Sequence, residues 1–167
     1  MTLIAAFDPG TVITGYAFIK TLESGQLELI DFGCIKPPSK YKLSDRYLVI
    51  YDAVAALLDR YQPDSAAVES QFVKLNPQSA LKLGMAKGMI VLAVKQRNIP
   101  LHEYAPKKTK LAATGHGSAS KGQVQRMMQL LFKLPTPPEP EDAADALAAA
   151  VCHAHALQTN QVLGIEV

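Results

Sequence analysis

The sequence predicts an α/β fold in which a mixed five-stranded sheet carries helices on both faces. Its first part contains three strand-like segments separated by turn residues, which is the pattern of an antiparallel meander. Further along the chain, helical and strand-like segments alternate, as in strands joined by helical crossovers. Hydrophobic residues make up 49% and charged residues 19% of the 167 residues, so the chain can bury the core of one domain.

The meander occupies the first 35 residues. Strand-like segments cover residues 2–8 and 13–20, and the turn signal Pro9-Gly10 joins them. A third segment at 27–35 completes the meander.

Seven further elements follow. Helices are indicated by apolar residues at three- and four-residue spacing, and strands by short apolar runs between turn residues. Residues 1–158 are expected to form a single domain and residues 159–167 a C-terminal tail. The expected elements are a helix at 43–61, a strand at 65–69, a helix at 77–97, a strand at 99–104, and helices at 106–114, 122–132 and 141–158.

The helix expected at 77–97 is apolar on most of its faces. Asn76 is suited to cap its first turn, and Pro77 to occupy the first helical position. Small residues, Gly84 and Ala86 among them, would let another helix approach closely. We therefore expect this helix to be buried by its own fold or by a partner chain.

The net charge of +2 hides an uneven distribution. Residues 104–138 hold six of the 17 Lys and Arg residues and none of the 15 Asp and Glu residues, which leaves the rest of the chain acidic. A basic segment on an acidic body indicates a surface for a polyanion such as nucleic acid. The alternative is a solvated surface that happens to be basic. The six cations are Lys107, Lys108, Lys110, Lys121, Arg126 and Lys133.

Four carboxylates stand where a packed core does not favour charge. Asp8 and Glu69 each end an apolar strand-like run, while Asp142 and Asp145 lie three residues apart in an alanine-rich helix. If the strands of Asp8 and Glu69 are parallel neighbours, both acids lie at one edge of the sheet. Residues three apart project from one helix face, which would bring all four acids together, whereas Glu141 should point elsewhere.

Converging carboxylates repel one another unless a cation neutralises them. Their oxygen atoms favour hard ions, so the pattern predicts Mg²⁺ or Mn²⁺ and metal-assisted phosphoryl chemistry. Two such ions, about 3.5–4 Å apart, would clamp a scissile phosphate. The alternative is unconnected surface acids, since Asp142 and Asp145 are also favourable in the first turn of a helix and Asp8 precedes a turn.

Four segments carry a resemblance to a known family. Phe7–Tyr16 (FDPGTVITGY) is similar to the opening motif of the RuvC Holliday-junction resolvases, and Val68–Phe72 (VESQF) resembles their second acidic motif. Residues 79–84 and 142–148 match the family in order and spacing. The resemblance covers about residues 2–156.

The resemblance implies an RNase H-like fold and a homodimeric Mg²⁺-dependent nuclease, with two ions in each active site and Mn²⁺ able to substitute. Its substrate would be a four-way (Holliday) DNA junction, resolved by paired symmetric nicks during recombination and repair, beside the RuvA–RuvB branch-migration complex. The family's base-stacking aromatic falls on Phe72. Its catalytic and metal-binding acids fall on Asp8, Glu69, Asp142 and Asp145. Its DNA-contacting lysines fall on Lys110 and Lys121, with Lys107 and Lys108 as further candidates.

Three other functions fit parts of the pattern. Residues 8–12 also resemble the phosphate loop of actin-like and sugar-kinase ATPases, but that class needs two such domains and a second glycine-rich loop. A non-catalytic junction-binding protein would use the basic segment without needing four converging acids. An RNase H-like nuclease acting on RNA or RNA–DNA hybrid would need the same acids, and only the family motifs favour junction DNA.

The remaining polar residues carry little functional signal. Cys34 and Cys152 lack metal-ligand spacing and are expected to be reduced thiols. His153 and His155 are expected to be packing or surface residues rather than ligands. No apolar stretch reaches the length of a membrane span, so we expect a cytoplasmic protein without a membrane partner.

Overall fold

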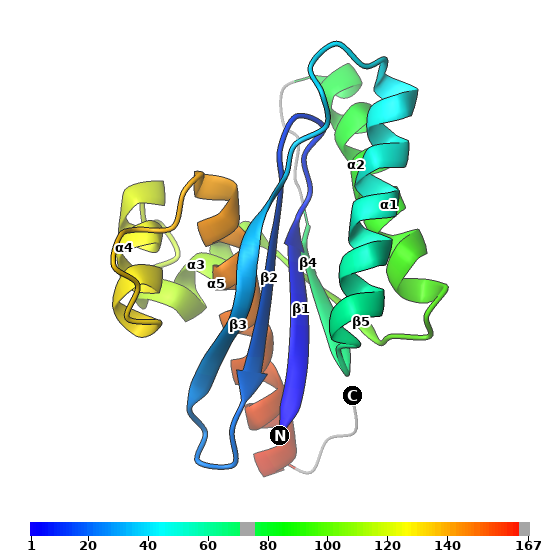
Figure 1. Ribbon diagram of the computed structural model, residues 1–167. Coiled ribbons are helices and arrows are strands. Elements are labelled where there is room, and N and C mark those ends of the chain that lie inside the picture. The colour runs from blue at the N-terminus through cyan, green and yellow to red at the C-terminus, as the bar shows by residue number, and fades with distance from the viewer. Residues whose placement is uncertain (71–75, 164–167) are drawn as a thin grey trace.

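A computed structural model describes residues 1–70 and 76–163 and contains a mixed sheet of the expected kind (Figure 1). Its strands lie in the order β3-β2-β1-β4-β5, with β1–β3 forming an antiparallel meander and β4 and β5 running parallel to β1. The predicted fold class is therefore confirmed. The strands are β1 (Thr2–Asp8), β2 (Thr14–Thr21), β3 (Leu27–Ile35), β4 (Ser65–Glu69) and β5 (Leu101–Tyr104).

Helices cover both faces of the sheet (Figure 1). On one face lie α1 (Leu43–Tyr61) and α2 (Pro77–Lys95), which pack against each other. On the other face lie α3 (Pro106–Thr114), α4 (Lys121–Leu131) and α5 (Glu141–Leu163). None of the helices in the described part of the chain is long and apolar enough to cross a membrane.

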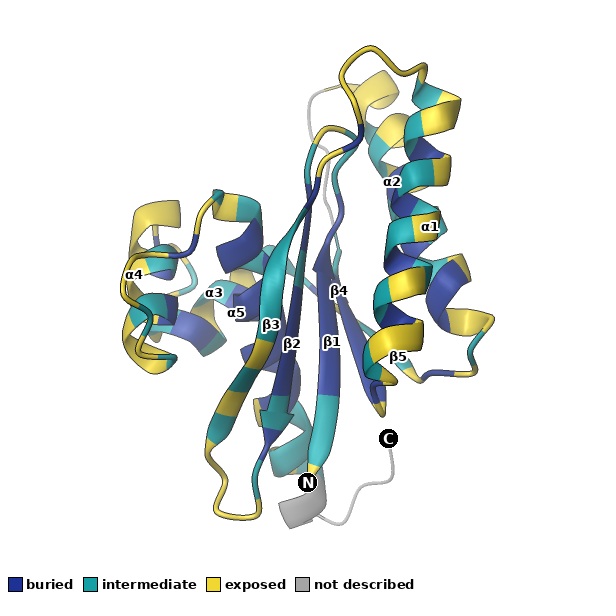
Figure 2. Cartoon of the chain, in the orientation of Figure 1, coloured by how far each residue is buried: buried dark blue, intermediate teal, exposed yellow. Residues whose placement is uncertain are grey.

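The central strand β1 supplies both cores, because alternate side chains point to opposite faces of a sheet. Ile4 and Ala6 lie in the core beneath α5, whereas Ala5 and Phe7 lie in the core beneath α1 and α2. Figure 2 shows β1 buried along most of its length. A strand covered on both faces reads as a continuous apolar run, and this is why the charge of Asp8 stands out in the sequence.

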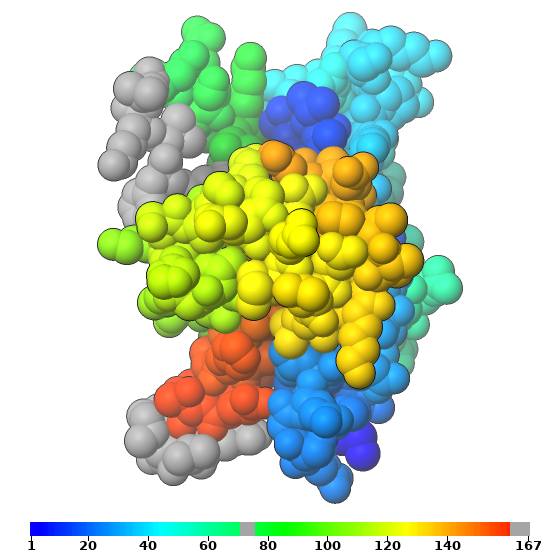
Figure 3. Space-filling view, turned by 90° about the vertical axis from the view of Figure 1, so that its left-hand side faces the viewer, coloured from blue at the N-terminus to red at the C-terminus, as the bar shows by residue number. Residues whose placement is uncertain are grey.

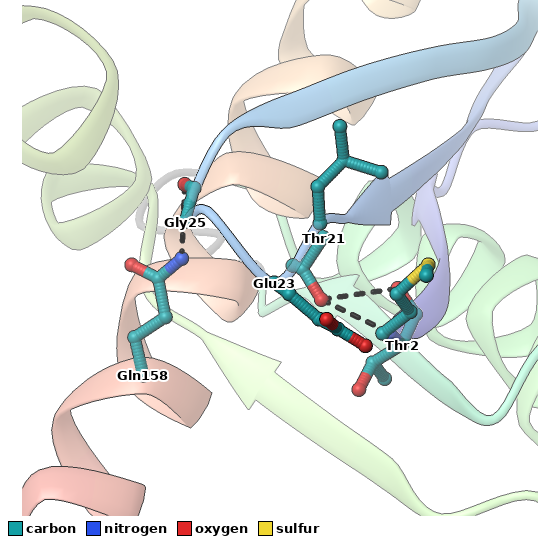
Figure 4. A pocket seen from close by; sticks show the side chains of 7 residues that line it. Thr2, Thr21, Glu23, Gly25 and Gln158 are labelled. Atoms are coloured by element: carbon teal, nitrogen blue, oxygen red, sulfur yellow. Dashed lines mark hydrogen bonds between the residues drawn. The ribbon is translucent and has the colours of Figure 1, made fainter.

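Helix α5 lies close against β1 and β2 because its inner face consists largely of alanine. Its far half is tied to the β2–β3 turn, where Gln158 Nε2 donates a hydrogen bond to the carbonyl oxygen of Gly25 (3.3 Å; Figure 4). The helix continues to Leu163, so the expected end at residue 158 was wrong, and residues 159–163 are helical. The buried alanines are Ala143, Ala144, Ala146, Ala148, Ala149, Ala150 and Ala154.

Helix α2 has two apolar faces with different roles. Ala86 and Ile90 are fully buried in the core of the same chain. Leu81, Met85 and Leu92 remain 67%, 46% and 45% exposed. The fold itself therefore buries one face of this helix and leaves an exposed apolar stripe on another.

Candidate active site

The parallel pairing of β1 and β4 brings Asp8 and Glu69 to the same edge of the sheet. Phe7 is the register partner of Val68, so the next residue of each strand is an acid. Both strands end at these residues, at the carboxyl edge where ligand sites form in open α/β sheets. Asp8 is only 8% exposed, so its carboxyl group is removed from most of the solvent.

A glycine lets α5 reach this edge. Gly15 is the partner of Asp8 across the β1–β2 pair. A Cβ atom added to Gly15 would lie 1.9 Å from the carbonyl oxygen of Asp142, so only glycine allows the first turn of α5 to approach so closely. This contact carries Asp142 and Asp145 to the sheet edge. Gly15 lies within the motif Phe7–Tyr16, but nothing in the sequence pattern marks it as the residue that lets α5 approach the sheet.

The turn after Asp8 is held by a buried threonine. Thr14 Oγ1 donates a hydrogen bond to the carbonyl oxygen of Gly10 (2.8 Å) and accepts one from its N–H (3.3 Å). A Cβ atom on Gly10 would lie 2.0 Å from the carbonyl oxygen of Ile13, so the turn again needs glycine. The turn therefore fixes the backbone next to Asp8.

The acids share one electrostatic environment. Burial, then the charges of Glu69, Asp145 and Asp142, raise the pKa of Asp8 to about 8. Burial also raises the pKa of Glu69 to about 7, although a hydrogen bond from Thr109 opposes the shift. The pKa of Asp145 is raised by burial and by Asp142. Such mutual effects are expected of carboxylates that lie near one another, and the convergence of all four acids on one metal stays a prediction.

The ligand atoms and the charge of this site suit a divalent metal ion. Carboxylate oxygens are the ligands that Mg²⁺ and Mn²⁺ prefer, and a set of acids that disfavour one another's ionised form gains from a cation. Within residues 1–70 and 76–163, however, no three His, Cys, Asp or Glu side chains are grouped closely enough to hold an ion as they stand. The ligand geometry is therefore not preformed in the described residues.

Two of the four candidate lysines lie beside the acids. Lys110 and Lys121 both lower the pKa of Glu69 and of Asp145. Lys121 also pairs with Glu141, with its Nζ 2.9 Å from Oε2. Glu141, which we expected to point elsewhere, thus binds one of the lysines next to the site.

The other candidates are placed less centrally. Lys108 Nζ lies 5.0 Å from the centre of the Tyr104 ring, and Lys107 is exposed. Residues 104–138, the acid-free segment, gather on the face viewed in Figure 3, where α3 and α4 lie. Phe72 lies outside the described residues.

A buried histidine links α5 to the sheet. His153 is fully buried, with Nε2 2.6 Å from Ser65 Oγ and Nδ1 2.8 Å from the Tyr104 hydroxyl. Its ring also lies against that of His102, with 4.6 Å between centres. The expected packing role is confirmed for His153, and Cys34 and Cys152 are free thiols.

Comparison with known protein families shows which family the chain matches. The family model described as crossover junction endodeoxyribonuclease RuvC matches residues 4–153, most of the chain. The chain belongs to the RuvC family. The family's matched span includes all four acids and both lysines beside them.

Individual relatives agree with this assignment. The chain is 57% identical to the crossover junction endodeoxyribonuclease RuvC of Protochlamydia amoebophila over 152 residues, 91% of this chain and 90% of the relative. It is 43% identical to the RuvC of Tolumonas auensis over 159 residues, 95% and 90% of the two chains. It is also similar to the structure of T. thermophilus RuvC in complex with a Holliday junction substrate, with a TM-score of 0.88, 29% identity and coverage of 96% and 97%. The RNase H-like fold implied by the sequence motifs is thereby confirmed.

Proposed function

We propose that this chain is a metal-dependent endonuclease that resolves four-way DNA junctions by paired symmetric nicks during recombination and repair. Family membership supports the reaction class, since the family and its relatives are named crossover junction endodeoxyribonucleases. The observation that carries the proposal is geometric: β1 and β4 end side by side at Asp8 and Glu69, and the close contact of Gly15 with Asp142 brings α5 to the same edge. A protein that only binds DNA would gain nothing from burying Asp8 and half-burying the other three acids at such cost.

The four acids would hold the metal, most suitably two Mg²⁺ ions, with Mn²⁺ as a substitute. When bound, such ions supply an activated water and stabilise the charge that develops on the leaving 3′-oxygen. Asp8 and Glu69 are fixed by the ends of β1 and β4, and Asp142 and Asp145 by α5. Burial keeps the carboxylates away from competing water and so strengthens their attraction for a cation.

DNA binding would rest on the basic face of α3 and α4. Lys110 and Lys121 lie close enough to the acids to change their pKa, which suits contact with phosphates flanking the cleaved bond. Lys107 and Lys108 would contact phosphates farther from the chemistry. From the family motif we also assign Phe72 to stacking on an unpaired base at the junction centre.

A homodimer would supply two active sites for the paired nicks, since a four-way junction has approximate two-fold symmetry. The exposed stripe on α2, Leu81, Met85 and Leu92, is the surface we assign to the interface. Gly84 lies on the exposed part of the same helix, with nothing within 4 Å of its added Cβ. Large apolar side chains in such a stripe are stabilised when a second copy covers them.

The proposed reaction also places the protein in the cytoplasm beside the RuvA–RuvB branch-migration complex. A motor that moves the junction and a nuclease that cuts it act on one DNA structure. Pull-down of RuvA–RuvB with and without junction DNA would test this association.

The proposed reaction is tested with three matched synthetic substrates: a four-way junction, a linear duplex and an RNA–DNA hybrid. Each is incubated with and without Mg²⁺. Paired nicks at symmetric positions in the junction alone, and only with Mg²⁺, would support the proposal. Preferred cleavage of the hybrid would favour the RNase H-type alternative, and tight junction binding without cleavage would favour a non-catalytic protein.

A further inference from the structure

Thr109 is a buried threonine that contacts one of the acids. It lies near the start of α3 and is only 1% exposed. Its Oγ1 is 3.0 Å from Glu69 Oε2 and 2.9 Å from the carbonyl oxygen of Pro106. In the part of the chain that the structure describes, this is the only side-chain hydrogen bond made by any of the four acids.

The hydroxyl group can hold Glu69 in both of its protonation states. When Glu69 is ionised, Thr109 donates its single proton to Oε2. When Glu69 is protonated, the carboxylic acid can donate to Thr109, which then donates to the carbonyl oxygen of Pro106. The contact therefore persists whether or not a cation has displaced the proton.

Thr109 engages only one of the two oxygens of the Glu69 carboxylate. Oε2 is engaged by Thr109, whereas Oε1 accepts no hydrogen bond from a described residue. Glu69 is the last residue of β4, and Ser70 N–H is already bonded to the carbonyl oxygen of Tyr104 (2.8 Å). The backbone is thus fixed up to Ser70, and the remaining freedom lies in the Glu69 side chain that Thr109 restrains.

Helix α3 also carries three of the four candidate lysines, Lys107, Lys108 and Lys110. Lys108 and Lys110 flank Thr109 in the chain, and the carbonyl oxygen of Lys108 lies 3.8 Å from Cys152 Sγ on α5. Helix α3, which carries lysines assigned to DNA binding, is therefore in contact with both Glu69 and α5, the helix of Asp142 and Asp145.

We infer that Thr109 is a positioning residue: its hydroxyl group fixes the orientation of the Glu69 carboxylate for metal binding and strand cleavage. The inference rests on the proposed function. Side chains that hydrogen-bond to a metal-binding carboxylate without touching the metal typically contribute about 10–100-fold to metal affinity or activity.

Four variants isolate the hydroxyl group. Thr109→Val keeps the shape of the side chain and removes the hydroxyl, and Thr109→Ser keeps the hydroxyl. Thr114→Val is the matched control, because Thr114 lies on the same helix and its hydroxyl group bonds, among the described residues, to main-chain groups alone: the carbonyl oxygens of Lys110 and His116 and the N–H of His116. If Thr109→Val does not fold, Thr109→Ser and Thr109→Ala form a second pair, since both lack the methyl group and only one keeps the hydroxyl.

Three quantities are measured for each variant: Mn²⁺ affinity by calorimetry without DNA, junction affinity in EDTA, and single-turnover cleavage at saturating junction. Thr109→Val should lose about tenfold or more in Mn²⁺ affinity and in cleavage rate, with junction affinity unchanged. Thr109→Ser and Thr114→Val should stay near wild type. Wild-type Mn²⁺ affinity and cleavage in Thr109→Val, or in Thr109→Ala should it replace that variant, would overturn the inference. A wild-type protein that does not cleave junctions would instead overturn the proposed function.

Discussion

Gly15 and Asp142 are in contact through their main chains, and a Cβ atom on Gly15 would lie 1.9 Å from the Asp142 carbonyl oxygen. Gly15 is paired with Asp8 across β1 and β2. The spacing between the sheet and the first turn of α5 therefore also sets the spacing between Asp8 and the two acids on α5.

Gly15→Ala should displace the first turn of α5 and impair the active site. Forcing a methyl group into a packed contact typically costs about 1–3 kcal/mol of unfolding free energy, and small misplacements of reacting groups can cost about a hundredfold in rate. Chemical denaturation and single-turnover cleavage would measure both effects. Gly122→Ala is the control, because nothing lies within 4 Å of the added Cβ. Equal cleavage by Gly15→Ala and wild type would show that this contact does not place the acids.

Asp8→Asn should abolish cleavage, retain junction binding and stabilise the metal-free protein at alkaline pH. The pKa of Asp8 is about 8 in the folded protein, against an ordinary value of 3.8. Between about pH 4 and pH 8 Asp8 is protonated in the folded state and ionised in the unfolded state. The free energy of unfolding of the wild type should therefore fall as the pH rises through this range. Asparagine has no proton to lose there, so Asp8→Asn should escape this loss and be more stable than wild type at pH 8.

Thermal melting in EDTA at pH 5 and pH 8 would test this sign. The melting temperature of Asp8→Asn relative to wild type should rise between the two pH values. If the difference in melting temperature between variant and wild type is the same at both pH values, and the variant still nicks DNA with Mg²⁺, then Asp8 is not part of the active site.

Lys110→Ala and Lys121→Ala should weaken junction binding and reduce its dependence on salt. Removing one lysine–phosphate ion pair should lower the slope of log affinity against log salt by about 0.9. Lys95→Ala is a control on the opposite helical layer, in the last turn of α2. Glu141→Gln should tighten binding slightly, because it releases Lys121 from its ion pair. Unchanged slopes in both lysine variants would mean that the basic face does not contact the phosphates.

Leu81→Glu should give a folded monomer, whereas Ala86→Glu should unfold the chain. Leu81 is 67% exposed on the stripe assigned to the interface, and Ala86 is fully buried beneath it. An unpaired charge in the core is among the most destabilising substitutions. Light scattering and thermal melting together would distinguish the two effects. A dimeric Leu81→Glu variant would place the interface elsewhere.

Sequence patterns were sufficient for the parts of the molecule that follow local rules. Strand periodicity and turn residues predicted the meander, and the apolar runs ending in Asp8 and Glu69 anticipated their common sheet edge, which the β1–β4 register confirms. The spacing of Asp142 and Asp145 likewise anticipated a shared helix face.

Other features depend on contacts between distant segments, which the sequence pattern does not encode. Helix α2 is apolar on most faces, so periodicity could not tell that Ala86 faces the core while Leu81 faces outward. The contact of Thr109 with Glu69 joins residues 40 positions apart. The last turn of α5 was missed because Thr159, Asn160 and Gln161 are polar and interrupt the apolar spacing by which a helix is recognised in a sequence.

The central claim is that Asp8, Glu69, Asp142 and Asp145 form one metal site, and anomalous diffraction from crystals soaked in Mn²⁺ tests it most directly. We expect anomalous peaks among these carboxylates, coordinated by their oxygen atoms, and their loss in Asp8→Asn crystals. Ordered side chains with no peak among them at saturating Mn²⁺, or peaks only at other acids, would contradict the account.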